Sequence, residues 1–291
     1  MKMDFKNALE LADLCSKRHC LISEVMRVRE ISLFEKTREE IDDRMSNALR
    51  IMRRSAQHPL AAPEKSMGGL IGGEAARLQA FHARGGSCGG TVLETAIIYA
   101  MAVLETNACM GLIVAAPTAG SAGVIPGVLL ALQQEYQLTD AQLLDGLFNA
   151  SAIGCLAMQN ATTAGAVGGC QAEIGTAAAM AASAATELLG GTPEMSIAAA
   201  SIVLMNMLGL VCDPVLGLVE CPCQNRNAAG AANALTAAFL ALAGIPAFIP
   251  LDEMLDCMYT VGKKIPPELR ETSQGGCAAT PTACARCAVL K

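Results

Sequence analysis

The first sixty residues place apolar side chains at helical spacing with charged residues between them, which predicts two amphipathic helices. In the second helix the apolar positions recur three or four residues apart, at Ile41, Met45, Leu49 and Met52. Ser32 and Glu35 have the spacing of a capping box and predict where this helix begins. Pro59 and Pro63 predict its end. Residues 1–65 are therefore expected to form a charged N-terminal helical segment.

The remaining residues, 66–291, are expected to form a second, all-α domain. Residues 66–90 are rich in glycine and predict loops, and strand patterns are weak throughout. The predicted helices cover residues 91–108, a segment that starts near 125, 141–159, 172–189, 193–210 and 227–243. The pattern favours a compact all-α, multi-helix bundle with buried Ala- and Leu-rich helices and glycine-rich loops.

Composition supports this fold and excludes some functions. Of 291 residues, 53% are hydrophobic but only 3% are aromatic, so Ala, Leu, Val, Ile and Met must fill the core. A net charge of −6 argues against a nucleic-acid partner, which requires a basic surface. No lysine lies between Lys65 and Lys263, and a pyridoxal phosphate enzyme needs an active-site lysine. We therefore expect no pyridoxal phosphate.

Two features bear on the cellular location. The uncharged run 227–251 is long enough to span a membrane, but its glycines and prolines and the lack of basic flanks favour a helix buried among other helices. The early charges do not resemble a signal peptide. We expect a cytoplasmic protein without a membrane segment, in which 13 cysteines indicate packing, metal binding or redox chemistry.

Three cysteines lie at breaks marked by glycine or proline: Cys170, Cys212 and Cys223. Backbone N–H groups at such breaks can point at sulfur, as they do around iron–sulfur clusters. Their spacing alone matches no compact ferredoxin pattern, and most buried cysteines only fill space. Paired Cys-x-x-Cys spacing, typical of zinc sites, occurs only at Cys284 and Cys287.

Four motifs, APTAGSAGVIPG, GGCQAEIG, CDPVLGLVECPCQNRNA and ETSQGGCAATPT, closely resemble the α subunit of iron–sulfur-dependent L-serine dehydratase (L-serine ammonia-lyase). The similarity covers nearly all of the chain after residue 60. It implies a [4Fe–4S] cluster held by Cys170, Cys212 and Cys223, with Cys221 the nearest competitor of Cys223. It also implies that an open iron acts as a Lewis acid on the hydroxyl of L-serine, which is deaminated to pyruvate and ammonia.

Several residues are candidates for substrate binding. Thr118, Gly120 and Ser121 form a small-residue turn before a helix, which is a natural anion site or simply a tight turn. The resemblance places Asn160 at a polar position near the cluster.

Arg226 is the only basic residue between Arg84 and Lys263 and lies three residues after Cys223. We expect it to anchor the substrate carboxylate or the negative charge of the cluster; the alternative is an ion pair with Asp213 or Glu220. Glu173 is expected to be structural.

No general base is evident, because only His82 of the three histidines lies near a matching motif. The resemblance implies that a β subunit supplies a Ser-Ser-His-Thr loop, so we expect a hetero-oligomer. The glycine loop that starts at Ser66 lacks one serine and one threonine hydroxyl of the family pattern. Cysteine or threonine as substrate, or an iron–sulfur scaffold without turnover, therefore remain alternatives, and roles for Cys221, Cys277, Cys284 and Cys287 stay open.

Overall fold

The computed structural model describes the backbone of residues 3–289 and the side chains of residues 3–286. Within this range the chain is helical, and its only extended pairing is an isolated bridge between Cys212 and Arg270. The predicted all-α fold is confirmed. The helices are α1 (Ala8–Arg18), α2 (Ile22–Phe34), α3 (Arg38–Ala61), α4 (Glu74–Ala83), α5 (Thr91–Ala108), α6 (Val124–Tyr136), α7 (Asp140–Asn160), α8 (Gly165–Gly168), α9 (Thr176–Leu188), α10 (Pro193–Met207), α11 (Cys223–Leu242), α12 (Leu251–Lys264) and α13 (Pro281–Val289), with 3₁₀ turns η1 (Ala119–Ser121), η3 (Val215–Gly217), η4 (Pro267–Leu269) and η5 (Gly276–Ala279) and the π-turn η2 (Gln171–Gly175).

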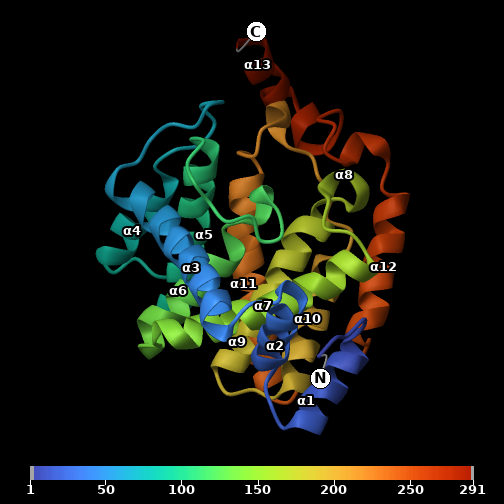
Figure 1. Cartoon of the computed structure of the whole chain (residues 1–291). Coiled ribbons are helices and arrows are strands. Elements are labelled where there is room, and N and C mark those ends of the chain that lie inside the picture. Colours follow the sequence, from blue (N-terminus) through green and yellow to red (C-terminus); the bar gives the residue numbers. More distant parts are fainter. Residues whose placement is uncertain (1–2, 290–291) are drawn as a thin grey trace.

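Helix α9 forms the centre of the molecule, enclosed by α6, α7, α10 and α11 (Figure 1). Its residues from Thr176 to Glu187 are all buried, and most of them are alanines, so neighbouring helices can approach closely. The same principle applies where α5 crosses α6: a Cβ at Gly127 would lie 2.7 Å from the Ala96 carbonyl oxygen. Small side chains thus replace aromatic bulk in this core.

The N-terminal helices pack onto this centre, α2 against α7 and α3 against α5. Leu11, Ile22 and Leu49 belong to the same hydrophobic core as Ile153 of α7. Arg27 of α2 is only 5% exposed, and its guanidinium pairs with Glu24, Asp42 and Asp145.

The predicted start at Ser32 is wrong, because the first sixty residues form three helices. Glu35 adopts a left-handed conformation (φ 53°) and ends α2. The capping box lies at Thr37 and Glu40 instead, with the Glu40 N–H donating to the Thr37 hydroxyl over 3.2 Å. Both pairs have capping-box spacing, and the backbone reversal at Glu35 selects the second.

Pro59 was expected to end this helix, but α3 continues through it to Ala61. A proline inside a helix leaves the carbonyl four residues earlier without its donor. Here that carbonyl belongs to Ser55, and the Thr106 hydroxyl donates to it over 2.7 Å. A side chain of α5 therefore satisfies the group that the proline leaves open.

Other boundaries agree with the sequence or refine it. The capping box at Thr139 and Gln142 and the N-cap at Thr192 are confirmed. The region 66–90, predicted as loops, contains α4, and the helix expected from 172 begins as the π-turn η2. Helices α12 and α13 were not predicted.

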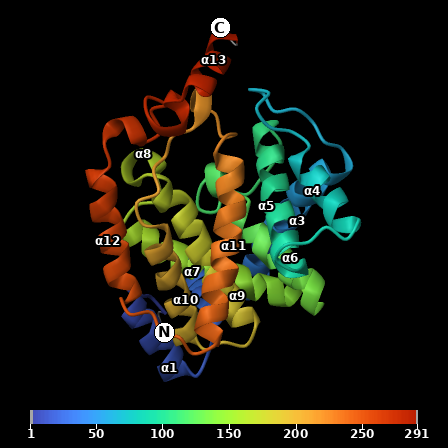
Figure 2. The ribbon, with the colours of Figure 1, turned by 180° about the vertical axis from the view of Figure 1, so that it is seen from behind.

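One helix of the described residues, α7, is long and apolar enough to cross a membrane, and 61% of its apolar stretch is buried inside the protein. The uncharged run 227–251 is divided between α11, a loop and the start of α12. In both views α8 and α13 lie at the end opposite α1 (Figures 1 and 2).

Candidate active site

The structure brings Cys170, Cys212 and Cys223 together from three separate segments. Cys170 and Cys212 are buried, and Cys223, the first residue of α11, is partly buried. Burial raises the pKa of Cys170 and of Cys223 to about 12. Burial also raises the pKa of Cys212, and the neighbouring Glu173, Cys170 and Cys223 add to this effect. The three thiols are therefore close enough to disfavour one another's ionisation.

Hydrogen bonds to backbone groups hold the chain in place at two of these cysteines, Cys170 and Cys212. Gln171, next to Cys170, is 1% exposed; its amide donates to Met258 O (2.8 Å) and accepts from Gly209 N (2.7 Å). The N–H of Cys212 donates to Leu269 O over 2.9 Å. Sequence reasoning missed Gln171, whose only signal is a polar side chain inside an apolar stretch.

Asn227 joins the start of α11 to the turn 118–121. Its buried amide donates to Gly120 O (2.7 Å) and Cys223 O (2.9 Å), and its oxygen accepts from Gly123 N (3.0 Å). Sequence reasoning missed this residue too. The signal was present, since Asn227 lies one helical turn after Cys223 in an Ala-rich helix.

Within the turn 118–121, the hydroxyl groups of the first and last residues hydrogen-bond to each other. Thr118 Oγ1 and Ser121 Oγ lie 3.0 Å apart, and Ser121 is fully buried. The Thr118 hydroxyl also donates to the carboxylate of Glu173. A Cβ on Gly120 would lie 3.4 Å from Glu173 Oε1. The turn therefore faces Glu173, whose pKa is raised by burial.

Arg226 lies at the same place. Its guanidinium pairs with Asp213 Oδ1 over 2.7 Å, donates to Val211 O over 2.8 Å and makes a hydrogen bond to the Cys170 sulfur. The ion pair considered from the sequence thus exists, and the same side chain reaches one of the three cysteines. The Arg226 guanidinium therefore balances the negative charge of Asp213 and would balance that of an ionised Cys170.

Asn160 makes its contacts elsewhere. It is exposed at the end of α7, and its amide donates to Leu156 O (3.0 Å) and Lys6 O (2.8 Å). The histidines also belong to other elements: His19 ends α1, His58 lies in α3, and His82 of α4 contacts Glu94 over 2.6 Å.

Glu220 holds the glycine loop that starts at Ser66. Its buried carboxylate accepts hydrogen bonds from Ser66 Oγ (2.6 Å), Gly68 N (2.7 Å) and Leu70 N (3.0 Å). The hydroxyl of Ser66 is therefore used within the protein.

Glu105, 1% exposed, holds the other end of the loop. It accepts from Gly73 N (3.1 Å), Ala75 N (2.9 Å) and the side-chain amide of Gln224 (3.0 Å). Because Gln224 follows Cys223, the glycine loop is connected on both sides of that cysteine.

Cys170, Cys212 and Cys223 are the residues that could hold an iron–sulfur group. Among the described residues no three His, Cys, Asp or Glu side chains are grouped as ligands for one metal ion. Three sulfur donors from separate segments, with one arginine beside them, are what a polynuclear cluster uses. Positive charge on such a group would also stabilise the deprotonated, negatively charged form of the three cysteines.

Cys221 and Cys277 lie near Asp213, the partner of Arg226, and the Cys277 N–H donates to Asp213 Oδ2 over 2.6 Å. Cys221 and Cys277 line a separate cleft of about 360 Å³ together with Arg286. Cys284 is exposed in α13, and the side chain of Cys287 lies outside the described residues.

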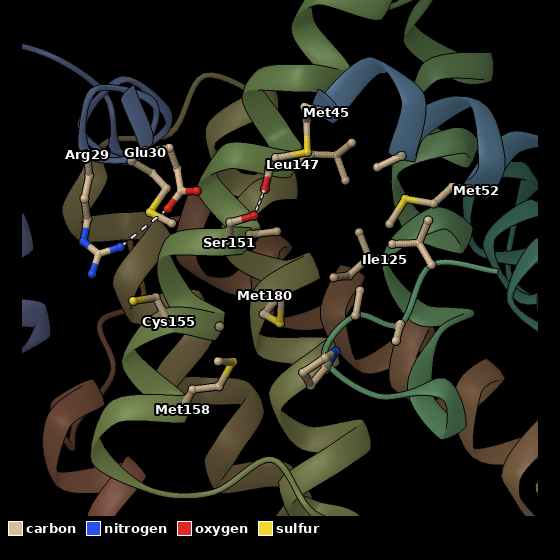
Figure 3. A pocket seen from close by; sticks show the side chains of 18 residues that line it. Arg29, Glu30, Met45, Met52, Ile125, Leu147, Ser151, Cys155, Met158 and Met180 are labelled. Carbon is tan, nitrogen blue, oxygen red and sulfur yellow. Dashed lines mark hydrogen bonds and ion pairs between the residues drawn. The ribbon is translucent and has the colours of Figure 1, made fainter. Parts of the chain in front are cut away.

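An apolar pocket of about 400 Å³ lies on the far side of the turn, between α2, α3, α6, α7 and α9 (Figure 3). The ion pair of Arg29 and Glu30 (3.6 Å) lies at one side of it. Its lining suits apolar groups and not a small zwitterion, and it includes Ala116 and Pro117, which directly precede the turn 118–121. Five methionines contribute to its wall: Met26, Met45, Met52, Met158 and Met180.

Comparison with known proteins agrees with these features. Residues 17–278 match the family described as Serine dehydratase alpha chain. The chain is 50% identical over 278 residues to the "Probable L-serine dehydratase, alpha chain" of Bacillus subtilis (strain 168), covering 96% of this chain and 92% of that protein. It is 42% identical over 275 residues to the "L-serine dehydratase, alpha chain" of Peptoniphilus asaccharolyticus, covering 94% of each. It is 35% identical over 286 residues to "L-serine dehydratase 2" of Escherichia coli (strain K12), covering 96% of this chain but 62% of that protein. The chain belongs to the serine dehydratase alpha chain family.

Proposed function

We propose that this chain is the α subunit of an iron–sulfur L-serine dehydratase, which converts L-serine to pyruvate and ammonia in the cytoplasm. The observation that carries the proposal is the meeting of Cys170, Cys212 and Cys223 beside Arg226 and the turn 118–121, in a chain of this family.

Cys170, Cys212 and Cys223 would hold a [4Fe–4S] cluster. When bound, the cluster supplies a Lewis-acidic iron that polarises the substrate hydroxyl and makes it a better leaving group. Loss of the α-proton and of the β-hydroxide from serine, together one water, gives aminoacrylate, whose hydrolysis yields pyruvate and ammonia. This route needs no pyridoxal phosphate, in agreement with the lysine-free stretch between Lys65 and Lys263.

The residues of this chain would bind the substrate and orient it. Arg226 places a positive charge next to the Cys170 sulfur, where it stabilises negative charge at the site. Asn227 fixes the backbone of the turn at Gly120 and Gly123, so that the turn offers a rigid wall to the substrate. Burial of the cysteines keeps water away from the reacting groups.

The proton acceptor would come from a β subunit. The relative from Escherichia coli is longer, since this chain spans 62% of its length. We infer that the remaining part corresponds to a separate β chain, and that the active enzyme is a hetero-oligomer. The three histidines of this chain do not belong to the segments that carry the cysteines.

The test is the iron and acid-labile sulfide content of protein reconstituted without oxygen. About four irons per chain are expected in the wild type, and C170A, C212A and C223A should each lose them. C221A tests the neighbouring cysteine, and C155A is the matched control, because Cys155 is a partly buried cysteine of α7. Zinc in place of iron, or iron loss in C221A with retention in C223A, would contradict the assignment.

The substrate is tested next, with the β chain added. Pyruvate from L-serine supports the proposal. A preference for L-threonine or L-cysteine would favour the alternative suggested by the glycine loop, in which Ser66 is bound to Glu220. An intact cluster without any keto acid would indicate a non-catalytic scaffold.

A further inference from the structure

Glu173 lies among the predicted site residues. Its Oε2 is 3.6 Å from the Cys212 sulfur, and its carboxylate accepts from the Thr118 hydroxyl. Two glycines approach this carboxylate closely. A Cβ on Gly165 would lie 2.5 Å from Oε2 and 3.0 Å from the Cys212 sulfur, and one on Gly120 would lie 3.4 Å from Oε1. A side chain at Gly165 would therefore collide with the carboxylate and with the Cys212 sulfur.

Three other buried carboxylates, those of Glu105, Glu187 and Glu220, each accept hydrogen bonds from nitrogen donors. Glu220 accepts from two backbone N–H groups and a serine, and Glu105 from two backbone N–H groups and an amide. Glu187 accepts from the N–H groups of Ile22 and Ser23 and from the Asn149 amide. Glu173 instead has one hydroxyl and one thiol as partners. Of these four carboxylates, that of Glu173 is the one without a nitrogen donor among the described residues.

No cation of the site neutralises this charge. The ion pairs of the described part of the chain do not include Glu173, and Arg226 is occupied by Asp213 and Cys170. Glu271, a further charge near Glu173, is negative. A carboxylate that is largely withdrawn from water and has no cationic partner is costly to ionise, so a cation is expected to bind here when the site is filled.

The backbone under Glu173 is also unusual. Glu173 is the central residue of the π-turn η2, which follows Cys170 directly. Single π-turns inside helices are rare, and they are found frequently at functional sites. This observation is independent of the charge argument and supports a role in the site.

We infer that the Glu173 carboxylate binds the α-ammonium group of the substrate and so selects amino acids over hydroxy acids. The inference rests on the proposed function, because it takes the substrate to be a small amino acid. The ammonium would supply the cationic partner that Glu173 lacks among the described residues, and at Glu173 it would lie beside Cys212 and the turn 118–121. Glu173 is thus a substrate-binding residue of this chain and not a structural one.

The experiment compares E173Q with wild type in the complete enzyme with its β chain and reconstituted cluster. Two ligands are used: L-serine, and 3-hydroxypropanoate, which is serine without its amino group. E173Q should raise KM for L-serine about 10- to 100-fold, the value of a charged hydrogen bond. The inhibition constant of 3-hydroxypropanoate should change less than about threefold, since this ligand has no ammonium. E173D keeps the charge and should restore part of the selectivity.

Iron content gives a readout that does not depend on turnover. E173Q should keep the iron and sulfide of the wild type, and loss of iron would overturn the inference by making Glu173 a support of the cysteines. Equal weakening of both ligands, or no change in either, would overturn it as well. E187Q is the matched control, because Glu187 is a buried carboxylate near the end of α9 with its partners in α2 and α7, and its loss should affect both ligands equally or not at all. Failure of the wild type to form pyruvate would instead refute the proposed function.

Discussion

Asn227 offers a direct test of how the turn 118–121 is held. Replacing it with alanine removes the hydrogen bonds to Gly120 O and from Gly123 N, at 2.7 and 3.0 Å. Cys223 O also loses the amide, but this carbonyl lies in the first turn of α11 and keeps its helical partner. The variant therefore leaves two backbone groups of the turn without partners.

The magnitude follows from those two groups. An unsatisfied buried polar group costs about 1 to 3 kcal/mol. Gly120 is only partly buried and falls at the lower end, and alanine returns about 0.5 kcal/mol of helix propensity relative to asparagine. N227A should thus lower the free energy of unfolding by about 1.5 to 3.5 kcal/mol, a large part of the stability of a typical domain.

Urea unfolding followed by circular dichroism measures this difference. The control is N206A, because Asn206 is an exposed helical asparagine whose amide donates to Asn233 over 2.9 Å. N206A should stay within about 0.5 kcal/mol of the wild type. If N227A unfolds at the same urea concentration as N206A, the turn does not depend on Asn227 and the reasoning is refuted.

Three further predictions concern stability. G127A should destabilise by about 1 to 3 kcal/mol in thermal unfolding because its Cβ would meet the backbone of α5, whereas G175A, whose Cβ would have only ordinary contacts, should be neutral or stabilising; the reverse order would contradict the helix crossing. Hydrogen bonds from Ser87 and the backbone lower the pKa of Glu94 to about 2. That stabilisation is present above the ordinary pKa of 4.5 and is lost as pH falls through about 2, so E94Q should be less stable than the wild type at neutral pH and equal to it near pH 2, and a gap that does not change with pH would disprove this. R27M should cost about 1 to 3 kcal/mol in urea unfolding and not more, since the three carboxylates around Arg27 keep access to water; a loss above 5 kcal/mol would show that they do not.

Local signals in the sequence predicted most helices correctly. A cap such as Thr139 with Gln142 depends on four neighbouring residues, so it can be identified from the sequence alone. The start of α3 could not, because Ser32 and Thr37 both have capping-box spacing and the reversal at Glu35 depends on packing. The passage of α3 through Pro59 requires the Thr106 hydroxyl, which comes from another helix.

In the candidate site, too, some residues could be identified from local sequence and others depend on contacts between distant segments. Motifs identified the three cysteines and Arg226, which the structure places together. Gln171 and Asn227 were missed because their role is to connect distant segments, and neither the spacing nor the composition of a segment contains that information.

The short stretch Glu220–Gln224 contains Cys223 and also holds the glycine loop that starts at Ser66. The carboxylate at one end and the amide at the other, acting through Glu105, hold the glycine loop, and Cys223 lies between them. A displacement of Cys223 would therefore act on both anchors of an exposed segment at once. Cleavage of the loop by a protease would consequently report, from outside the protein, how firmly Cys223 is held within it.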